Sequence, residues 1–381
     1  MTSTAMANLL LVPFPPPGHA EPMAALAAQL REDGNAVAVF AESDTTRWGL
    51  RRPLPPEMYV SADGAALYRH QFFGDVADMT RDIVDLASEC GVELIVTDVL
   101  MPGGGLAAEL AGLPWVSLSC APVPELDSYR LFMPDSAVPS FAPQSTRESL
   151  GLPAGDDRNL LGRTSGRLHL IPTTPRFAGF PELPAHVALV GPFAAVPPER
   201  PGQAPSARPT ITVTSSSNSM AQLTLVQERY LSAAVEALAG LEVTGLVTHD
   251  ATGRPAANVR FLGRTPHEAL FDRSAAVVTH GGWGTVSRAL MRGLPLVLVP
   301  FYGDQPYIAA RCTDLGVGIA LPAETVTAAE LRDAIRAVIW EPRYREAAWE
   351  LAAELLAAAP LAAASSMITS SALAKGDHHG R

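Results

Sequence analysis

Residues 275–305 read AAVVTHGGWGTVSRALMRGLPLVLVPFYGDQ. A short β-branched run is followed by a glycine-rich turn, by an amphipathic helix that ends at Gly293, and by a second apolar strand that leads to Asp304 and Gln305. This order predicts a βαβ unit. A helix that starts at a glycine-rich turn presents unpaired N–H groups and the positive end of its dipole, which favour a phosphate. The stretch therefore predicts a binding site for a diphosphate leaving group.

The composition points to a folded, acidic protein. A length of 381 residues favours two domains, and a hydrophobic fraction of 48% favours packed cores over disorder. The formal net charge of -11 argues against a basic face for nucleic acid. The three cysteines form no CxxC pair, so we expect neither a zinc site nor a disulfide framework, and a reducing cytoplasm fits.

The amino-terminal residues argue for a first strand rather than a signal peptide. The run MTSTAMANLLLVPFPPPGH contains no lysine or arginine, and prolines break its short apolar stretch. No run approaches the ~18 apolar residues of a membrane helix, so no membrane span is expected. The oligomeric state stays open, with a homodimer as one option.

The amino-terminal half begins with a βαβ pattern. Residues 8–14 predict a buried parallel strand, the run that starts at Pro22 predicts a helix, and residues 36–41 predict a second strand. His19 and Glu21 then lie in the turn at the carboxyl end of the first strand. Ligands bind at that edge in open α/β sheets.

The rest of this half alternates between regular and irregular segments. Residues 42–73 and 121–163 look irregular and rich in proline, and we interpret the second segment as a binding surface. Helices are predicted at 75–90 and 103–111, and strands at 93–97, 115–120, 167–171 and 187–190.

The βα rhythm restarts after a proline-rich stretch. Thr327 and Glu330 have the spacing of a capping box at the start of one of the later helices. Besides the βαβ unit, strands are predicted at 210–214, 243–248 and 259–262, and helices at 223–238, 328–339 and 343–358.

These patterns predict an α/β fold with two Rossmann-like domains that face each other across a cleft. The predicted parts are a first domain over residues 1–195, a linker over 196–209, a second domain over 210–342, a last helix over 343–360 and a flexible tail over 361–381.

The glycine-rich turn offers several groups to a phosphate. Gly281, Gly282 and Gly284 let the backbone approach a ligand closely. His280 can donate a hydrogen bond, and Thr285 can either donate to a phosphate oxygen or cap the helix. An ordinary βα turn explains the same glycines. Neither GxGxxG nor GxxxxGK[ST] occurs here, so the dinucleotide and Walker motifs are not supported.

Two further polar pairs follow predicted strands of the second half. Ser215 and Ser216 could complete the phosphate cradle, and a polar surface turn explains them equally well. Asp304 and Gln305 can accept from and donate to vicinal hydroxyls of a sugar. A helix N-cap at Asp304 is compatible with that role.

His19 is a candidate general base, because its imidazole titrates near neutral pH and lies at a strand end. Asp98 ends another strand of the same predicted sheet and could orient the imidazole, although a lone loop histidine explains His19 as well. The sequence contains no DxD motif, so we expect no divalent metal and no cofactor beyond the co-substrate. The helix dipole and neutral donors would then stabilise the leaving group.

Three stretches together resemble the GT-B nucleotide-sugar glycosyltransferases, in particular the UDP-glycosyltransferase-like enzymes with which bacteria decorate natural products. These stretches are residues 6–34, 93–98 and, most specifically, 258–305, with VRFLGRTPHEAL upstream of HGGWGT and DQP. The likeness implies an acceptor-binding first domain and a donor-binding second domain. It also implies that the helix from Arg343 onward crosses back to the first domain.

The resemblance implies a role for each matching residue. His19, in the GHxxP position, matches the general base, and Asp98 matches the acid that pairs with it. Asp304 and Gln305 match the pair that reads donor sugar hydroxyls. The diphosphate contacts match Ser215, Ser216, His280, Gly282 and Thr285.

One departure concerns the nucleobase. Many relatives have Trp-x-Pro-Gln where this chain has Arg264, Thr265, Pro266 and His267. The tryptophan stacks on the base, and the guanidinium plane of Arg264 could stack in its place. The choice between a UDP-sugar and a dTDP-sugar therefore stays open.

The sequence predicts an inverting glycosyltransferase that acts on a small hydrophobic natural-product aglycone. Two alternatives remain at this point. One is a nucleotide-sugar epimerase or hydrolase on the same fold, and the other is a catalytically silent nucleotide-sugar-binding helper.

Overall fold

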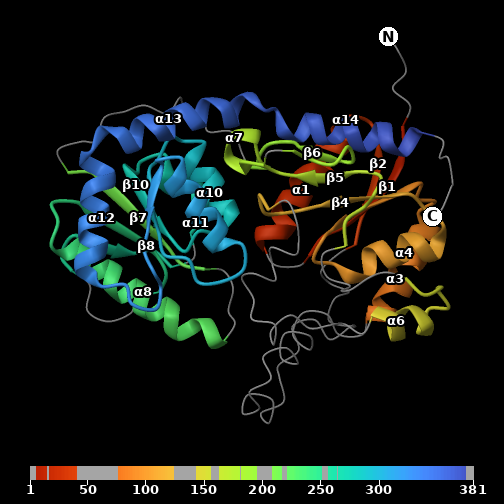
Figure 1. Ribbon diagram of the computed structural model, residues 1–381, viewed down its shortest axis with the longest axis horizontal. Coiled ribbons are helices and arrows are strands. Elements are labelled where there is room, and N and C mark those ends of the chain that lie inside the picture. Colours follow the sequence, from red (N-terminus) through yellow and green to blue (C-terminus); the bar gives the residue numbers. More distant parts are fainter. Residues whose placement is uncertain are drawn as a thin grey trace. The chain divides into compact units, whose positions relative to one another are not determined.

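The computed structural model describes most of the chain as two compact units (Figure 1). Unit 1 comprises Met1–Pro172, Phe180–Phe193 and Ala359–Arg381, and unit 2 comprises Thr173–Gly179 and Ala194–Ala358. The described residues are 6–14, 17–40, 76–123, 143–155, 163–180, 182–194, 208–216, 221–250, 256–263 and 265–374.

Unit 1 contains a parallel sheet in the order β2-β1-β3-β4-β5-β6. The chain runs outward from β1 to β2 on one side and then continues from β3 on the other side. The strand order thus reverses between β1 and β3, which is where open α/β sheets bind ligands. The strands are β1 Asn8–Val12, β2 Ala36–Val39, β3 Leu94–Asp98, β4 Trp115–Leu118, β5 His169–Ile171 and β6 Val187–Leu189.

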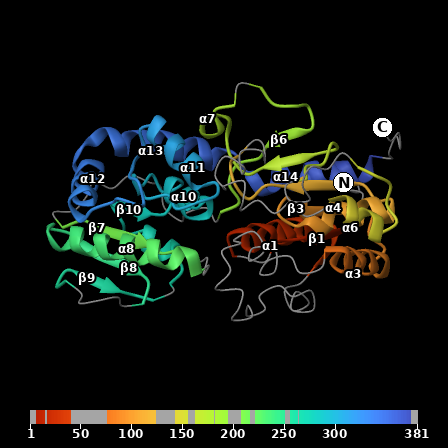
Figure 2. The same cartoon turned by 60° about the horizontal axis from the view of Figure 1, so that its bottom comes forward.

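Helices cover both faces of this sheet (Figure 2). Residues of α1 and α14 share one buried cluster with the strands, and residues of α3 and α4 share the cluster on the opposite face. Burial on both faces explains why the strands are continuous apolar runs. The helices are α1 Pro17–Glu32, α3 Val76–Glu89, α4 Pro102–Ala111, α6 Pro143–Ser149 and α14 Pro360–Leu373.

Unit 2 repeats this plan with a parallel sheet in the order β12-β11-β10-β7-β8-β9. Here the order reverses between β7 and β10. The strands are β7 Thr210–Thr214, β8 Thr244–Thr248, β9 Val259–Phe261, β10 Ala276–Thr279, β11 Leu296–Leu298 and β12 Gly318–Ala320. The helices are α7 Pro175–Ala178, α8 Ala221–Ala239, α9 Glu268–Phe271, α10 Trp283–Leu290, α11 Gln305–Asp314, α12 Ala328–Trp340 and α13 Pro342–Ala357.

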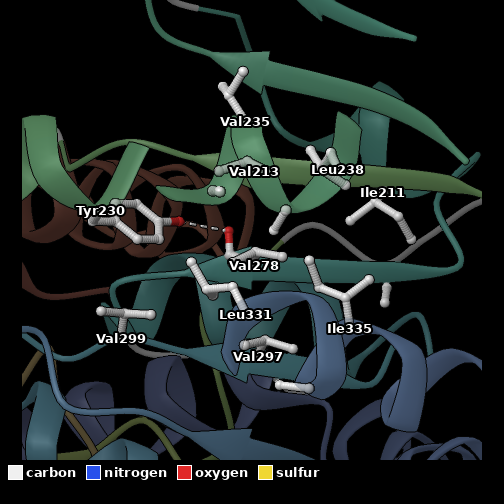
Figure 3. Packing of buried hydrophobic residues seen from close by; sticks show 14 of the residues in the cluster. Ile211, Val213, Tyr230, Val235, Leu238, Val278, Val297, Val299, Leu331 and Ile335 are labelled. Atoms are coloured by element: carbon white, nitrogen blue, oxygen red, sulfur yellow. Dashed lines mark hydrogen bonds between the residues drawn. The ribbon is translucent and has the colours of Figure 1, made fainter. Parts of the chain in front are cut away.

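The core of unit 2 is also divided by its sheet. Helices α8 and α12 pack on one face, and Figure 3 shows Leu331 and Ile335 of α12 beside Val278 and Val297 of the strands. The hydroxyl of Tyr230 in this cluster donates to the backbone oxygens of Thr214 and Val278 at 3.1 and 3.0 Å. That buried tyrosine therefore ties together β7 and β10, the two strands at the reversal.

The first helix begins earlier than the sequence pattern predicts. Pro17 rather than Pro22 occupies the first helical position, and Pro22 lies inside α1. A proline there withholds one N–H from the carbonyl of Gly18, a cost that the first turns of a helix tolerate best. The placement of His19 and Glu21 in a turn is therefore wrong, because both residues lie in the first turns of α1.

The predicted flexible tail is wrong over α14. Ala364, Ser365 and Ile368 of this helix are buried against unit 1. The Ser365 hydroxyl donates to Asp33, and Asn35 donates to the Thr369 hydroxyl at 3.1 Å. The helix predicted to cross back to the first domain corresponds to α13, which belongs to unit 2, whereas the next helix, α14, belongs to unit 1.

One described segment, Pro342–Leu373, is long and apolar enough by length and composition to cross a membrane. The expectation that no run qualifies therefore has one exception. Core helices of soluble proteins meet the same criteria of length and composition. This segment comprises two helices, α13 and α14, which are separated by Ala359 with φ 41°. Leu351 of α13 and Ile368 of α14 each lie in the core of their unit.

Several smaller predictions also need correction. The segment 121–163 contains the helix α6, so it is not irregular throughout. Helix α7 lies in the amino-terminal half of the sequence but belongs to unit 2, where the buried Phe177 packs on Trp283 with ring centroids 4.6 Å apart. The elements α7, α9 and β12 were not predicted. Residues 42–73 and the predicted linker up to residue 207 lie outside the described residues.

Candidate active site

The reversal of strand order in unit 1 explains why His19 and Asp98 meet. β1 and β3 are adjacent parallel strands, so their carboxyl ends lie side by side. Asp98 is the last residue of β3, and His19 is the third residue of the helix that follows β1. The sequence prediction that these two side chains lie at one sheet edge is confirmed.

The two side chains form a hydrogen-bonded pair. Nδ1 of His19 donates to Oδ2 of Asp98 at 2.8 Å. The carboxylate is fully buried, while the imidazole keeps 21% of its side-chain surface exposed. The backbone N–H of Leu100 donates to Oδ1 of Asp98 at 2.8 Å, and the ring of Phe14 lies edge-on to the imidazole at 5.1 Å. Because Nδ1 carries the donated proton, Nε2 is left as a proton acceptor.

The thiol of Cys120 is a third member of this group, and the sequence analysis missed it. Its Sγ donates to Oδ2 of Asp98 at 2.9 Å. The sequence did hold one indication of this contact: Cys120 follows β4, which is the strand next to β3, so it lies at the same sheet edge as Asp98. The ligand atoms of His19, Asp98 and Cys120 lie within 4.8 Å of one another, as in a metal site. The separations of 2.8 and 2.9 Å fit hydrogen bonds better, since tetrahedral zinc holds its ligands roughly 3.3 Å apart.

In unit 2 the glycine-rich turn connects β10 to α10 as predicted. Gly282 is the N-cap residue of α10 with an extended backbone, so Thr285 lies inside the helix and does not cap it. Gly281 has φ 94°, a left-handed conformation that glycine adopts without strain. A Cβ atom on Gly282 would lie 2.9 Å from Nε2 of His280. The turn therefore needs a glycine there to hold this imidazole against the start of the helix.

His280 is buried and neutral. Burial, with a smaller contribution from His267, lowers its pKa to about 4. Its ring stacks on Phe301 with centroids 5.7 Å apart. Nδ1 is buried with no hydrogen-bond partner among the residues that the structure describes. An unpartnered lone pair costs less here than an unpartnered N–H, so we assign the proton to Nε2, beside Gly282.

His267 and Thr285, which the resemblance gave to the nucleobase and the diphosphate, lie together. Nδ1 of His267 is 3.4 Å from Oγ1 of Thr285. Burial lowers the pKa of His267 to about 4, and the positive charge of Arg288 acts in the same direction. His267 also stacks on Phe271 at 5.3 Å. A neutral imidazole can therefore orient the threonine hydroxyl at the first turn of α10.

The serines after β7 are tied to neighbouring strands and helices. The Ser215 hydroxyl donates to the backbone oxygen of Thr248 at 2.7 Å, and its N–H donates to the Thr248 hydroxyl at 3.3 Å. The N–H of Ser216 donates to Oε1 of Gln227 at 2.7 Å. These bonds stabilise the turn. Both donors of Ser215 are used within the protein, so a phosphate contact by its hydroxyl would require the hydroxyl to turn away from Thr248.

Asp304 and Gln305 begin α11, and their environments differ. Oε1 of Gln305 accepts from the N–H groups of Phe301 and Tyr302 at 2.8 and 3.2 Å, so its Nε2 remains the donor. Asp304 occupies the N-cap position but makes no side-chain capping hydrogen bond. Thr265 donates through its hydroxyl to the backbone oxygen of Leu262 at 3.0 Å. Arg264 lies outside the described residues.

Comparison with known proteins connects this arrangement to enzymes of antibiotic biosynthesis. Residues 240–368 match the family described as Erythromycin biosynthesis protein CIII-like, C-terminal domain. The chain is 29% identical over 405 aligned residues to 4'-demethylrebeccamycin synthase of Lentzea aerocolonigenes. That alignment covers 89% of this chain and 93% of the synthase.

Solved structures agree over nearly the whole chain. The glycotransferase of kitacinnamycin superposes with a TM-score of 0.74 at 19% identity, covering 97% of this chain and 99% of that one. The glycosyltransferase VinC, solved in complex with dTDP, gives a TM-score of 0.64 at 24% identity, covering 96% and 99%. At these identities the likeness establishes the fold, with two parallel six-stranded sheets and flanking helices.

Proposed function

We propose that the chain, which has the GT-B fold and is similar to glycosyltransferases of antibiotic biosynthesis, transfers a sugar from a dTDP- or UDP-sugar to a small hydrophobic aglycone. We place the reaction in the cytoplasm and assign it to inversion at the anomeric carbon. The observation that carries the proposal is the 2.8 Å hydrogen bond between His19 and Asp98.

Unit 1 supplies the proton acceptor in this proposal. Nε2 of His19 takes the proton of the acceptor hydroxyl as the oxygen attacks the anomeric carbon. Asp98 holds the imidazole through Nδ1 and stabilises the imidazolium that forms, because its buried carboxylate is the adjacent negative charge. A single displacement by this oxygen inverts the anomeric configuration. No covalent sugar–enzyme intermediate is needed.

Unit 2 supplies the site for the leaving diphosphate. Nε2–H of the neutral His280 and the hydroxyl of Thr285 donate to its oxygens at the start of α10, where the helix dipole adds positive potential. Gly281, Gly282 and Gly284 allow the backbone to approach the phosphates. In our proposal the Ser215 hydroxyl turns from Thr248 to the diphosphate when the donor binds, and Ser216 lies in the same turn after β7. These neutral donors take the place of a divalent metal in our proposal.

The sugar and the nucleobase of the nucleotide-sugar would each contact a further group of residues in unit 2. In our proposal Nε2 of Gln305, whose Oε1 already accepts two backbone hydrogen bonds, donates to a sugar hydroxyl, and Asp304 accepts from the neighbouring hydroxyl. In our proposal Thr265 and His267 contact the nucleobase. Because VinC was solved with dTDP, we favour a dTDP-sugar over a UDP-sugar. An epimerase, hydrolase or binding helper is not favoured by the relatives, which carry the names of transferases or synthases.

Replacing His19 tests this function. We expect His19→Ala to lower the rate of sugar transfer by roughly 10²–10⁴-fold, the usual contribution of a general base. Binding of dTDP, measured by titration calorimetry, should not change, because the diphosphate site lies in unit 2. His186→Ala is the matched control, since this partly exposed histidine lies in unit 1 away from the sheet edge. Full transfer activity in His19→Ala would overturn the assignment.

A further inference from the structure

The thiol of Cys120 has no role in the mechanism above, yet it touches both members of the His19–Asp98 pair. Sγ lies 2.9 Å from Oδ2 of Asp98 and 3.9 Å from the backbone oxygen of His19. Only 6% of the residue is exposed. Cys120 follows β4, and its Sγ contacts both the buried carboxylate of Asp98 and the backbone of His19 in the first turn of α1.

The arrangement makes the thiol a donor. Oδ1 of Asp98 accepts from the N–H of Leu100, and Oδ2 accepts from Nδ1 of His19 and from Sγ of Cys120. A carboxylate can only accept, so the sulfur must keep its proton. A thiolate at 2.9 Å would place two negative charges side by side in a buried site, which is strongly unfavourable.

Two donors thus share one carboxylate oxygen. The negative charge on Oδ2 stabilises the imidazolium that forms when His19 takes a proton, and each additional donor to Oδ2 reduces that stabilisation. A thiol is a weak donor, so it fixes the carboxylate while withdrawing little charge. The ionisable groups Asp98 from β3 and Cys120 after β4 lie within 4.8 Å of a ring nitrogen of His19, and the exposed Glu21 lies two residues further along α1.

We propose that Cys120 is a positioning residue that sets the basicity of His19 by sharing Oδ2 of Asp98. This inference rests on the proposed function of His19 as the general base. It predicts that the strength of the hydrogen-bond donor at residue 120 controls the proton affinity of the His19 imidazole through the shared carboxylate oxygen of Asp98.

Titration of the His19 imidazole by NMR in the full-length protein tests the proposal without requiring activity. The signal is assigned by its loss in His19→Gln. We expect Cys120→Ala, which removes the donor, to raise the titration midpoint by roughly 0.5 pH unit. Cys120→Ser, which supplies a stronger donor, should lower it. Cys90→Ala is the control, because that cysteine is exposed and lies outside this group.

Opposite shifts in the two variants support the proposal, and a purely structural role for Cys120 would not produce them. Shifts of the same sign, or no shift in either variant, would overturn it. Cys120→Ser is close in size to the original residue, so it tests the idea even if Cys120→Ala folds poorly. The acidic limb of the kcat/KM profile should move in the same two directions. If no sugar is transferred but the midpoints shift as stated, the proposed function fails and the coupling of Cys120 to His19 stands.

Discussion

His19 and His280 differ in what surrounds the imidazole. His19 is partly exposed and donates to a buried carboxylate, which favours the protonated form during the reaction. His280 is buried beside the imidazole of His267, and burial lowers its pKa to about 4. Near neutral pH it is therefore a neutral donor. In the proposed function, histidine therefore serves as a proton acceptor in unit 1 and as a hydrogen-bond donor to phosphate in unit 2.

The absence of a side chain at Gly282 leaves room for the His280 imidazole, so a larger residue there should weaken binding of the nucleotide-sugar donor. Ala is compatible with the backbone at φ -62° and ψ 135°, but its Cβ would lie 2.9 Å from Nε2 of His280. We expect Gly282→Ala to raise the Kd for dTDP roughly 10–100-fold, the value of one hydrogen bond to a charged group. Gly166→Ala is the control, since a Cβ there meets nothing within 4 Å. An unchanged Kd by calorimetry in Gly282→Ala would contradict the role of His280.

Strand-end residues were predictable, and their side-chain partners were less so. Asp98 ends a strand, and His19 and His280 come after strands, that their apolar runs identify, and parallel strands bring such ends to one edge. Cys120 was missed because a lone cysteine carries no motif. The contact between His267 and Thr285 joins residues 18 positions apart through the packing of α9 beside α10, which no local pattern encodes.

At the scale of elements, α14 shows where sequence patterns fall short. The segment is rich in alanine and serine, so it shows little alternation between apolar and polar positions. Its small side chains instead allow close approach to α1, and Arg167 donates to Ser371 near its end. Helices such as α12, with the capping box of Thr327 and Glu330, were predictable because their end signals are local.

Ile368 should anchor α14 to unit 1. Its side chain is fully buried in the cluster formed with α1 and the sheet. We expect Ile368→Ala to lower the free energy of unfolding of unit 1 by about 2–5 kcal/mol, the usual cost of such a truncation in a core. The neighbouring Met367→Ala should change it little, since Met367 is 39% exposed. Equal urea midpoints for the two variants would show that α14 does not pack as described.

At the scale of the molecule, the two units repeat one design. In each, the order of a six-stranded parallel sheet reverses beside its first strand, and polar residues follow the two strands at the reversal. Alternating strands and helices made this plan predictable. The exact residue ranges of the two units were not predictable. Helix α7 lies in the amino-terminal half of the sequence but belongs to unit 2, and α14 follows unit 2 in the sequence but belongs to unit 1; both assignments depend on long-range packing.

Buried histidines should make the fold sensitive to acid. Burial lowers the pKa values of His169, His267 and His280 to about 4 from 6.5. The unfolded chain therefore binds protons between pH 6.5 and 4 that the folded chain does not. Stability is fully present above pH 6.5 and should fall by about 1 kcal/mol per pH unit per histidine below it. Urea unfolding at pH 7.5, 5.5 and 4.5 measures this dependence of the free energy of unfolding on pH. We expect His280→Gln to reduce the slope. An unchanged slope in His280→Gln would contradict the burial of His280.

The most direct test of the account is the anomeric configuration of the product. A dTDP-sugar of α configuration would be offered with a panel of polycyclic aglycones, and the product of the wild-type protein would be analysed by NMR. Direct displacement by an oxygen that His19 deprotonates predicts a β-linked product, which His19→Ala should form roughly 10²–10⁴-fold more slowly. An α-linked product, or undiminished β-linked product from His19→Ala, would contradict the account.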